Sequence, residues 1–239
     1  MMAITNFQPL YKQVYDLLTA RLVKGEWKPA EPLPSEMALA EQLGVSQGTV
    51  RKALNQMVAE KLLDRRQGKG TFVAEHTQES SLFRFFRHRL PGGESVIPET
   101  EVLDVTRTRA SSRAQLCLSL SASDEVTAMT RLRSVLGQPT IYEVIYQPQA
   151  IFPNLDQQAE IPNSLYTLYQ EKYGVSIVEV KDEIHAAALP AEAAEPLGLQ
   201  VGTPVLMIER ASVSLDGRTV EWSQSYCSSE NYVYAVTLR

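Results

Sequence analysis

The sequence predicts an α+β protein whose helical N-terminal part ends in a short hairpin and whose C-terminal part is built on an antiparallel sheet. Apolar residues recur at helical spacing between residues 9 and 58. From residue 99 onward, alternating strand-like runs are separated by turn residues. The 239 residues are enough for one large or two ordinary domains, so the change of pattern indicates two domains.

The N-terminal part predicts a helix over residues 9–23, followed by a second helix, a tight turn and a third helix. Ser35 and Ser46 are residue types that begin helices, and Gly44 is one that ends them. The third helix has an apolar face at positions i, i+3, i+4, i+7 and i+8: Val50, Ala53, Leu54, Met57 and Val58. Its outer face carries amides, a hydroxyl and cations, which can bind base edges and phosphates in a major groove. This pattern is that of a helix-turn-helix with a recognition helix.

Residues 61–74 predict a hairpin wing, because two short strand-like runs flank a glycine-rich loop. The glycines let the backbone approach DNA closely, and the basic residues can neutralise phosphates or enter a minor groove. The predicted DNA-binding residues are Ser35, Gln47, Thr49, Arg51, Lys52, Arg65, Arg66, Gly68, Lys69, Gly70 and Thr71.

Four sequence pieces within residues 9–74 resemble the winged helix-turn-helix of GntR-type bacterial transcriptional regulators. They are Leu-Pro-Ser-Glu at 33–36, Gly-Val-Ser at 44–46, Thr-Val-Arg at 49–51 and Arg-Arg-Gln-Gly-Lys-Gly-Thr-Phe-Val at 65–73. The resemblance implies that the partner is double-stranded operator DNA. Members of that family commonly carry operator-contacting arginines at the positions of Met37 and Gln47. We expect a different operator here, since glutamine prefers adenine edges and methionine cannot donate a hydrogen bond.

Charge is distributed unevenly along a chain whose net charge is -5. Residues 1–75 hold ten Lys and Arg against eight Asp and Glu, whereas the remainder holds 13 against 20. A mildly basic part joined to an acidic part is typical of a DNA-binding domain that carries a separate module. The chain shows no membrane-spanning run, no signal peptide and only two cysteines, so we expect a cytoplasmic protein with reduced thiols.

Residues 76–98 are predicted to be a linker and the entry to the second domain. The segment begins polar, becomes aromatic and basic, and ends in turn residues. Its cluster of Phe83, Phe85 and Phe86 is too apolar for a free tether and is expected to pack on a partner surface. His88 has no metal-ligand neighbours in the sequence and is expected to be an ordinary surface or packing histidine.

The C-terminal part predicts an antiparallel sheet with two helices. The expected strands cover residues 100–109, 126–135, 140–147, 175–189, 204–215, 218–226 and 232–238, and the expected helices cover 165–173 and 190–197. Asn163 or Ser164 is expected to cap the first of these helices. Turns are predicted at residues 137–139 and at Asp216-Gly217, the latter of type I′. The last strands would form a terminal meander.

Short pieces spread over residues 99–239 resemble the UTRA domain of the histidine-utilisation-repressor branch of GntR regulators. They include Thr-Arg-Leu-Arg at 130–133, Ser-Leu-Tyr at 164–166, Gly-Thr-Pro at 202–204 and Val-Glu-Trp-Ser at 220–223. The resemblance implies a chorismate-lyase-like fold that binds a small effector. The domains are therefore expected to be 1–75 for DNA binding, 76–98 as linker and 99–239 for effector binding and dimerisation.

Two arginines lie on one face of a predicted strand, because Arg131 and Arg133 are two residues apart. Two guanidinium groups on one face can hold a phosphate or carboxylate, or they can lie on a solvated strand edge. The resemblance favours binding, and it implies an effector site made of Arg131, Arg133, Glu143, Ser164, Tyr166 and Glu221. A strict two-residue loop at 137–138 would turn Glu143 to the opposite face, whereas a loop one residue longer or shorter would keep it beside the arginines.

The hairpin at Asp216-Gly217 is expected to place Ser212 opposite Glu221 and Arg210 opposite Ser223. This forms a polar patch that continues through Ser225. Glu221 could pair with Arg210, or it could accept hydrogen bonds from a ligand.

These observations favour a metabolite-responsive transcriptional regulator, a repressor that binds a palindromic operator as a homodimer and is released by a small anionic effector. One alternative is an enzyme acting on a small aromatic acid, although the sequence shows no nucleophile-and-base constellation, phosphate loop or metal cluster. Another is a constitutive architectural DNA binder, which would leave the acidic domain without a role. No cofactor, metal or membrane partner is expected.

Overall fold

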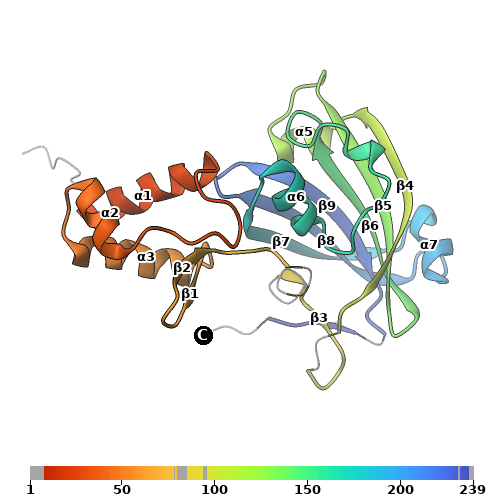
Figure 1. Ribbon diagram of the computed structural model, residues 1–239. Coiled ribbons are helices and arrows are strands. Elements are labelled where there is room, and N and C mark those ends of the chain that lie inside the picture. Colours follow the sequence, from red (N-terminus) through yellow and green to blue (C-terminus); the bar gives the residue numbers. More distant parts are fainter. Residues whose placement is uncertain (1–7, 78, 80–84, 94–95, 231, 237–239) are drawn as a thin grey trace, which may run out of the picture. The chain divides into compact units, whose positions relative to one another are not determined.

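The computed structural model describes residues 8–77, 79, 85–93, 96–230 and 232–236. The chain forms two compact units, an N-terminal unit that ends at His76 and a C-terminal unit that begins at Thr77 (Figure 1). Each unit has its own core, and each is described by itself below.

The N-terminal unit contains the three predicted helices, α1 (Leu10–Val23), α2 (Glu36–Leu43) and α3 (Gln47–Ala59). Ser35 Oγ accepts a hydrogen bond from the Ala38 amide at 3.1 Å, and Ser46 Oγ accepts one from the Thr49 amide at 3.2 Å. Gly44 ends α2 in the left-handed conformation. The apolar faces bury Val14, Leu18, Leu39, Val50, Ala53, Leu54 and Met57. The predicted helix-turn-helix is confirmed, and Leu10 and Leu17 of α1 are about half exposed.

The predicted wing is the hairpin of β1 (Leu63–Arg66) and β2 (Gly70–Val73). Its tip turns through Gly68 and Gly70, whose φ angles of +70° and +121° favour glycine. The loop before α2 pairs with β2 through an isolated bridge between Pro32 and Phe72, since the Leu33 amide donates to Thr71 O at 2.8 Å and the Val73 amide donates to Glu31 O at 2.9 Å. The wing is therefore held by backbone hydrogen bonds along both sides of β2.

The C-terminal unit is organised by one six-stranded antiparallel sheet in the order β4-β5-β6-β9-β8-β7 (Figure 1). Its strands are β4 (Glu99–Arg109), β5 (Glu125–Val135), β6 (Gln138–Pro148), β7 (Ile177–Ala188), β8 (Pro204–Ser214) and β9 (Thr219–Cys227). The alternating runs of the sequence thus predicted all six strands, because each has one face packed against other elements.

Helices cover both faces of the sheet. One face packs against α6 (Leu165–Tyr173) and Phe85, through a core that includes Met129, Ile145 and Tyr169. The opposite face packs against α5 (Ser112–Leu118) and α7 (Ala191–Leu197), through separate clusters around Trp222 and Tyr142. Helix α5 was not predicted from the sequence, and a short helical turn, η1 (Leu155–Gln157), precedes α6. Polar side chains on the α6 face are therefore enclosed between two layers.

The C-terminal strand was predicted wrongly as part of a meander. Instead, β10 (Val233–Tyr234) pairs with β3 (His88–Arg89) in a separate two-stranded sheet. Part of the segment expected to be a linker, residues 76–98, is thus built into the C-terminal unit. Phe85, expected to pack on a partner surface, instead belongs to the core of its own unit, with its ring centroid 5.2 Å from that of Tyr166 in an edge-on contact. Phe83 and Leu238 lie outside the described residues.

Two turns differ from their predictions. Leu136 and Gly137, both with positive φ, form the turn between β5 and β6, and a bulge at Arg133/Ser134 shifts the register. Between β8 and β9 the Gly217 amide donates to Ser214 O at 2.8 Å, and only Gly217 of the pair Asp216-Gly217 has positive φ. A type I′ turn needs positive φ at both residues, so that prediction is wrong. A bulge at Ser212/Val213 nevertheless leaves Ser212 opposite Glu221 and Arg210 opposite Ser223, as expected.

Candidate functional site

The residues predicted to contact DNA gather on α3 and on the wing of the N-terminal unit. Gln47, Arg51 and Lys52 are exposed on α3, while Thr49 is half buried and hydrogen-bonds the cap Ser46. Arg65 and Arg66 on β1, and Gly68, Lys69 and Gly70 at the tip, are exposed; Thr71 is half buried. Ser35 is exposed at the start of α2, where its side chain caps the helix.

Glu36 joins the recognition helix to the wing. Its carboxylate lies 2.8 Å from Arg51 Nε and 3.2 Å from Arg65 Nη2, and it accepts a longer hydrogen bond of 3.4 Å from Gln47 Nε2. Arg51 and Arg65 are about half exposed, so these ion pairs are open to exchange with phosphate oxygens. Glu36 was not predicted as a functional residue, although it belongs to the Leu-Pro-Ser-Glu piece at 33–36. Its carboxylate orients two cations that are 14 residues apart in the chain.

Two further cations lie over aromatic rings. Lys52 Nζ is 4.0 Å from the Tyr11 ring centroid, and the Arg66 guanidinium is 4.2 Å from that of Phe72. These contacts hold long side chains at the surface with their charges exposed. Met37, at one of the positions where the resemblance leads us to expect arginine, is 72% exposed. A basic surface on a helix-turn-helix and its wing defines a DNA-binding unit.

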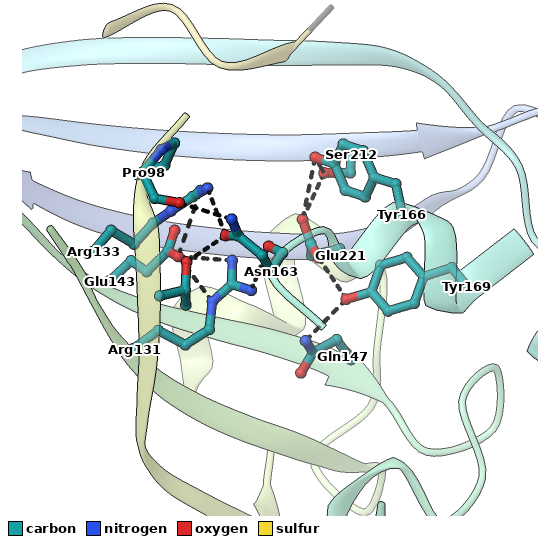
Figure 2. Close-up of polar contacts among 11 residues, drawn as sticks. Pro98, Arg131, Arg133, Glu143, Gln147, Asn163, Tyr166, Tyr169, Ser212 and Glu221 are labelled. Atoms are coloured by element: carbon teal, nitrogen blue, oxygen red, sulfur yellow. Dashed lines mark hydrogen bonds and ion pairs between the residues drawn. The ribbon is translucent and has the colours of Figure 1, made fainter. Parts of the chain in front are cut away.

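A polar pocket lies on the α6 face of the sheet in the C-terminal unit. It encloses about 460 Å³, counting the solvent at its open mouth. Its lining includes all six residues predicted to bind an effector: Arg131, Arg133, Glu143, Ser164, Tyr166 and Glu221. Figure 2 shows that the arginines and Glu143 lie on one side and the Glu221 cluster on the other. The structure thus brings together residues that are 90 positions apart in the sequence.

Arg131 and Glu143 form a buried ion pair. They are opposite each other on β5 and β6, with Arg131 Nη2 2.7 Å from Glu143 Oε1 and Arg131 Nε 2.9 Å from the same oxygen. The bulge after Arg133 produces this register, which the sequence had left open. Burial acts to raise the pKa of Glu143, but the neighbouring Arg131 and Arg133 outweigh it and lower that pKa below its ordinary value. Glu143 is therefore ionised, and its short contacts are with Arg131.

Arg133 is buried but incompletely neutralised. Its Nη1 lies 3.9 Å from Glu143 Oε1, and its Nη2 lies 3.5 Å from Asn163 Oδ1. Among the described residues none accepts a hydrogen bond from its Nε, and its guanidinium lies 4.8 Å from the ring centroid of Phe86. Burial, opposed by Glu143, lowers the pKa of Arg133 to about 10. Arg133, which lines the pocket, therefore carries a charged guanidinium with one unused donor, its Nε.

The N-terminus of α6 borders the pocket beside Arg133. Ser164 occupies the N-cap position, as predicted, but its side chain forms no capping hydrogen bond. Asn163 instead donates to Pro98 O at 2.7 Å, accepts from Thr100 Oγ1 at 2.5 Å and receives the weaker contact from Arg133 (Figure 2). The amide groups at a helix start attract anions, so α6 reinforces the positive character of this side.

Glu221 lies at the other side in a network of neutral donors. Its carboxylate accepts from Tyr169 Oη at 2.6 Å and from Ser212 Oγ at 2.8 Å, and Gln147 Nε2 in turn donates to Tyr169 Oη at 2.9 Å. Burial raises the pKa of Glu221, against the lowering effect of these hydrogen bonds. The Glu221 carboxyl group is held by neutral hydroxyl donors, so it can replace one of their hydrogen bonds by one from a ligand hydroxyl.

The expected alternative in which Arg210 pairs with Glu221 is wrong. Arg210 instead forms a two-pronged ion pair with Asp182 of β7, with both N–O distances 2.7 Å. Burial acts to lower the pKa of Arg210, but the hydrogen bond and charge of Asp182 raise it above its ordinary value. Two of the three pocket arginines are thus paired one to one with a carboxylate, whereas Arg133 only shares Glu143, at 3.9 Å.

Several pocket residues were not predicted: Phe85, Phe86, Ile145, Asn163, Leu165, Arg210 and Ser223. Two of these had a visible signal, because the expected register already grouped Arg210 and Ser223 with Glu221. Asn163 and the phenylalanines had none, since their contacts depend on how segments distant in the sequence fold onto the sheet.

On the opposite face, Glu183, His185 and Glu209 place potential ligand atoms within 4.8 Å of one another. The Glu209 carboxylate is already bound by Arg113, with Nη2–Oε2 at 2.6 Å and Nε–Oε1 at 3.2 Å. A cation here would have to displace that guanidinium, and we assign the cluster no role.

His88 gives the C-terminal unit a testable pH dependence. Burial and the nearby Arg133 and Arg210 lower its pKa from 6.5 to about 4, against Glu143 and Asp182. A histidine with a lowered folded-state pKa stabilises the fold above its unfolded pKa, and this contribution is lost as the pH falls from 6.5 towards 4. We expect a loss of about 3 kcal/mol from this residue, because one pKa unit corresponds to about 1.4 kcal/mol.

Urea unfolding of the full chain between pH 7 and pH 4, followed by tyrosine and tryptophan fluorescence, measures this effect. His88→Leu should flatten the curve relative to the wild type, and His185→Leu, which removes an exposed histidine, should leave it unchanged. Equal slopes for the wild type and His88→Leu would contradict the assignment.

Fold and sites together define a DNA-binding regulator that carries a small-molecule domain. The model of the bacterial regulatory proteins of the gntR family matches residues 10–73, and the UTRA domain model matches residues 94–233. The chain belongs to the GntR family of bacterial transcription regulators, in the group with a UTRA domain.

Relatives of similar length support this assignment. The chain is 30% identical to the mannosyl-D-glycerate transport/metabolism system repressor MngR of Escherichia coli, over 96% of this chain and 95% of the relative. It is 29% identical to the transcriptional repressor NagR of Bacillus subtilis, over 95% and 93%. The ligand-binding domain of a GntR-family regulator from Bordetella bronchiseptica superposes with a TM-score of 0.59 and 27% identity, covering 65% of this chain and 98% of that domain. PhnF of Mycobacterium smegmatis shares the fold, with a TM-score of 0.56 and 21% identity over 95% of this chain and 99% of that protein.

These findings set aside the enzyme alternative, because the family and the relatives are transcription regulators. In the part of the chain that the structure describes, no helix is both long and apolar enough to span a membrane.

Proposed function

We propose that the protein is a repressor that binds a palindromic operator as a homodimer and is released by a small anionic effector bound in the pocket of the C-terminal unit. The anionic character of the effector is inferred from the surroundings of Arg133. This residue is a buried cation with an unused donor, and its nearest carboxylate is already paired with Arg131. An anionic group at Arg133 would gain charge-assisted hydrogen bonds and would face the start of α6.

The repressor and dimer assignments rest on other supports. Two relatives that align over almost the whole chain are named repressors. Regulators with this DNA-binding motif commonly bind two half-sites through two symmetric copies, so a dimer would explain a palindromic operator. A cytoplasmic location fits a protein that acts on DNA.

The route from effector to DNA is proposed to run through the first residues of the C-terminal unit, which follow the wing in the sequence. Phe86 and His88 belong to this segment in sequence, and Phe86 also lines the pocket over Arg133. A ligand that displaces or orders Phe86 would change the end of the segment that leads to the wing. Coupling free energies of about 1–3 kcal/mol are typical of such switches.

The test is a DNA-binding titration of the full chain. An operator fragment is first isolated by selection from random DNA, and its dissociation constant is measured by fluorescence anisotropy with and without sugar phosphates, sugar acids and their neutral parent sugars. We expect some of the anionic compounds to weaken binding about tenfold or more, and the neutral sugars to have no effect. Unchanged binding with every anion would contradict the release mechanism, and a sedimenting species of one chain mass in the DNA complex would contradict the dimer.

A further inference from the structure

Glu36 holds the side-chain amide of Gln47 as well as two cations. Glu36 is the first residue of α2 and Gln47 is the first residue of α3, so their contact joins the starts of the two helices. Glu36 Oε2 accepts hydrogen bonds from Gln47 Nε2 at 3.4 Å and from Arg51 Nε at 2.8 Å. Its Oε1 accepts one from Arg65 Nη2 at 3.2 Å. The Glu36 side chain is 21% exposed, so the carboxylate is a fixed group against which the exposed Gln47 amide is turned.

A carboxylate orients a neighbouring amide in one direction. Carboxylate oxygens accept hydrogen bonds, so the NH₂ group of Gln47 points towards Glu36 and the carbonyl Oε1 points away from it. In the reversed orientation Oε1 would face a negatively charged oxygen. The second N–H of the NH₂ group is left beside Oε1 on the outer edge of the amide.

Gln47 lies at the part of a recognition helix that meets base edges. The N-terminal residues of such a helix contact bases in the major groove, and Gln47 is exposed at the first position of α3. In the orientation set by Glu36, Oε1 can accept from adenine N6 while the second N–H donates to adenine N7. Guanine presents the acceptor O6 in place of the N6 donor, so Oε1 would meet a like partial charge.

We infer that Glu36 is a positioning residue that makes Gln47 discriminate adenine from guanine at one base pair of each operator half-site. This inference rests on the proposed operator binding and gives the changed operator a particular base. When Arg51 exchanges Glu36 for a phosphate, Oε2 still accepts from Gln47, so the amide keeps its orientation on DNA. The negative charge of Glu36 disfavours phosphates of every sequence alike, so its contribution is to specificity.

Two operators that differ at a single base pair test this inference with the full chain. Selection from random DNA, for the wild type and for Gln47→Ala, identifies the base pair at which Gln47 sets a preference. Fluorescence anisotropy then compares adenine with guanine at that position, and we expect the wild type to prefer adenine about tenfold. Glu36→Gln can donate to Gln47 Oε1 and so permits the reversed amide, which should reduce the preference to about twofold or less. Glu36→Ala should do the same by removing the acceptor.

Glu41→Gln is the matched control, because Glu41 is an exposed carboxylate on the same helix. It loses the same charge and should keep the preference of the wild type, since a general charge effect cancels in the ratio of the two affinities. A role of Glu36 in folding alone would lower the melting temperature and both affinities without changing their ratio.

The inference and the proposed function fail in different ways. If either Glu36 variant keeps the wild-type preference, or if the wild type prefers guanine at this position, the positioning role is wrong and operator binding stands. The same holds if Gln47→Ala selects the operator of the wild type unchanged at every base. If the wild type selects no common sequence from random DNA, the proposed operator binding itself is wrong.

Discussion

We expect Arg133→Met to abolish the response to the effector while raising the stability of the effector-free protein. The wild-type guanidinium is buried, its pKa is lowered to about 10, and its nearest carboxylate belongs to Arg131. Replacing such a group by an apolar side chain of similar length removes an uncompensated charge, which should raise the free energy of unfolding by about 1–3 kcal/mol. The same change removes the proposed anion partner, and effector affinity should fall by about 100-fold or more.

Urea unfolding and calorimetric titration measure the two effects. Arg107→Met is the matched control, because Arg107 is an exposed residue near the end of β4 that forms an ion pair with the exposed Glu125. It should change neither stability nor affinity appreciably. An Arg133→Met protein that is less stable than the wild type would show that the network around Arg133 is structural, and one that keeps its effector affinity would show that the anion binds elsewhere.

The second large effect is expected at Arg51 on the recognition helix. If this side chain binds a phosphate, Arg51→Ala should weaken operator binding and reduce the slope of log K against log salt by about one. In the free protein Arg51 is held by Glu36, 2.8 Å away, so the contact would be made by exchanging a carboxylate for a phosphate.

Anisotropy titrations of the operator fragment at several salt concentrations give both the dissociation constant and its salt slope. Arg21→Ala serves as the control, because Arg21 lies on α1 and pairs with Glu26 away from the predicted surface. An Arg51→Ala slope equal to that of the wild type would exclude a phosphate contact, and an equal loss in the control would point to a general charge effect.

Local sequence patterns predicted the N-terminal unit and most of the sheet for a clear physical reason. Helix faces and caps are set within a few residues, so Ser35, Ser46 and Gly44 marked the limits of α2 and α3 correctly. Helix α5 was not predicted, although Ser111 caps it and Ala114 and Leu118 give it a buried face. Its seven residues contain too few turns for periodicity to stand out.

The site was predicted only in part, because its decisive features are not local. The bulge beside Arg133 fixes Glu143 next to Arg131, and nothing in the residues 133–134 marks it. The pairing of Arg210 with Asp182 depends on β7 lying beside β8. The position of His88 depends on β3 pairing with β10, which is not part of the six-stranded sheet. Strand order and register decide which charged side chains have a close partner, and in this protein Arg133 is the pocket arginine without a carboxylate of its own.

An anion bound at Arg133 and operator DNA are proposed to favour different conformations of the protein, so that each weakens binding of the other. The most direct test measures the affinity of the full chain for an active anionic compound by calorimetry, once without DNA and once with saturating operator fragment. Thermodynamic linkage predicts that operator DNA weakens effector binding by the same factor by which the effector weakens operator binding. Equal effector affinity in the two titrations would contradict the account.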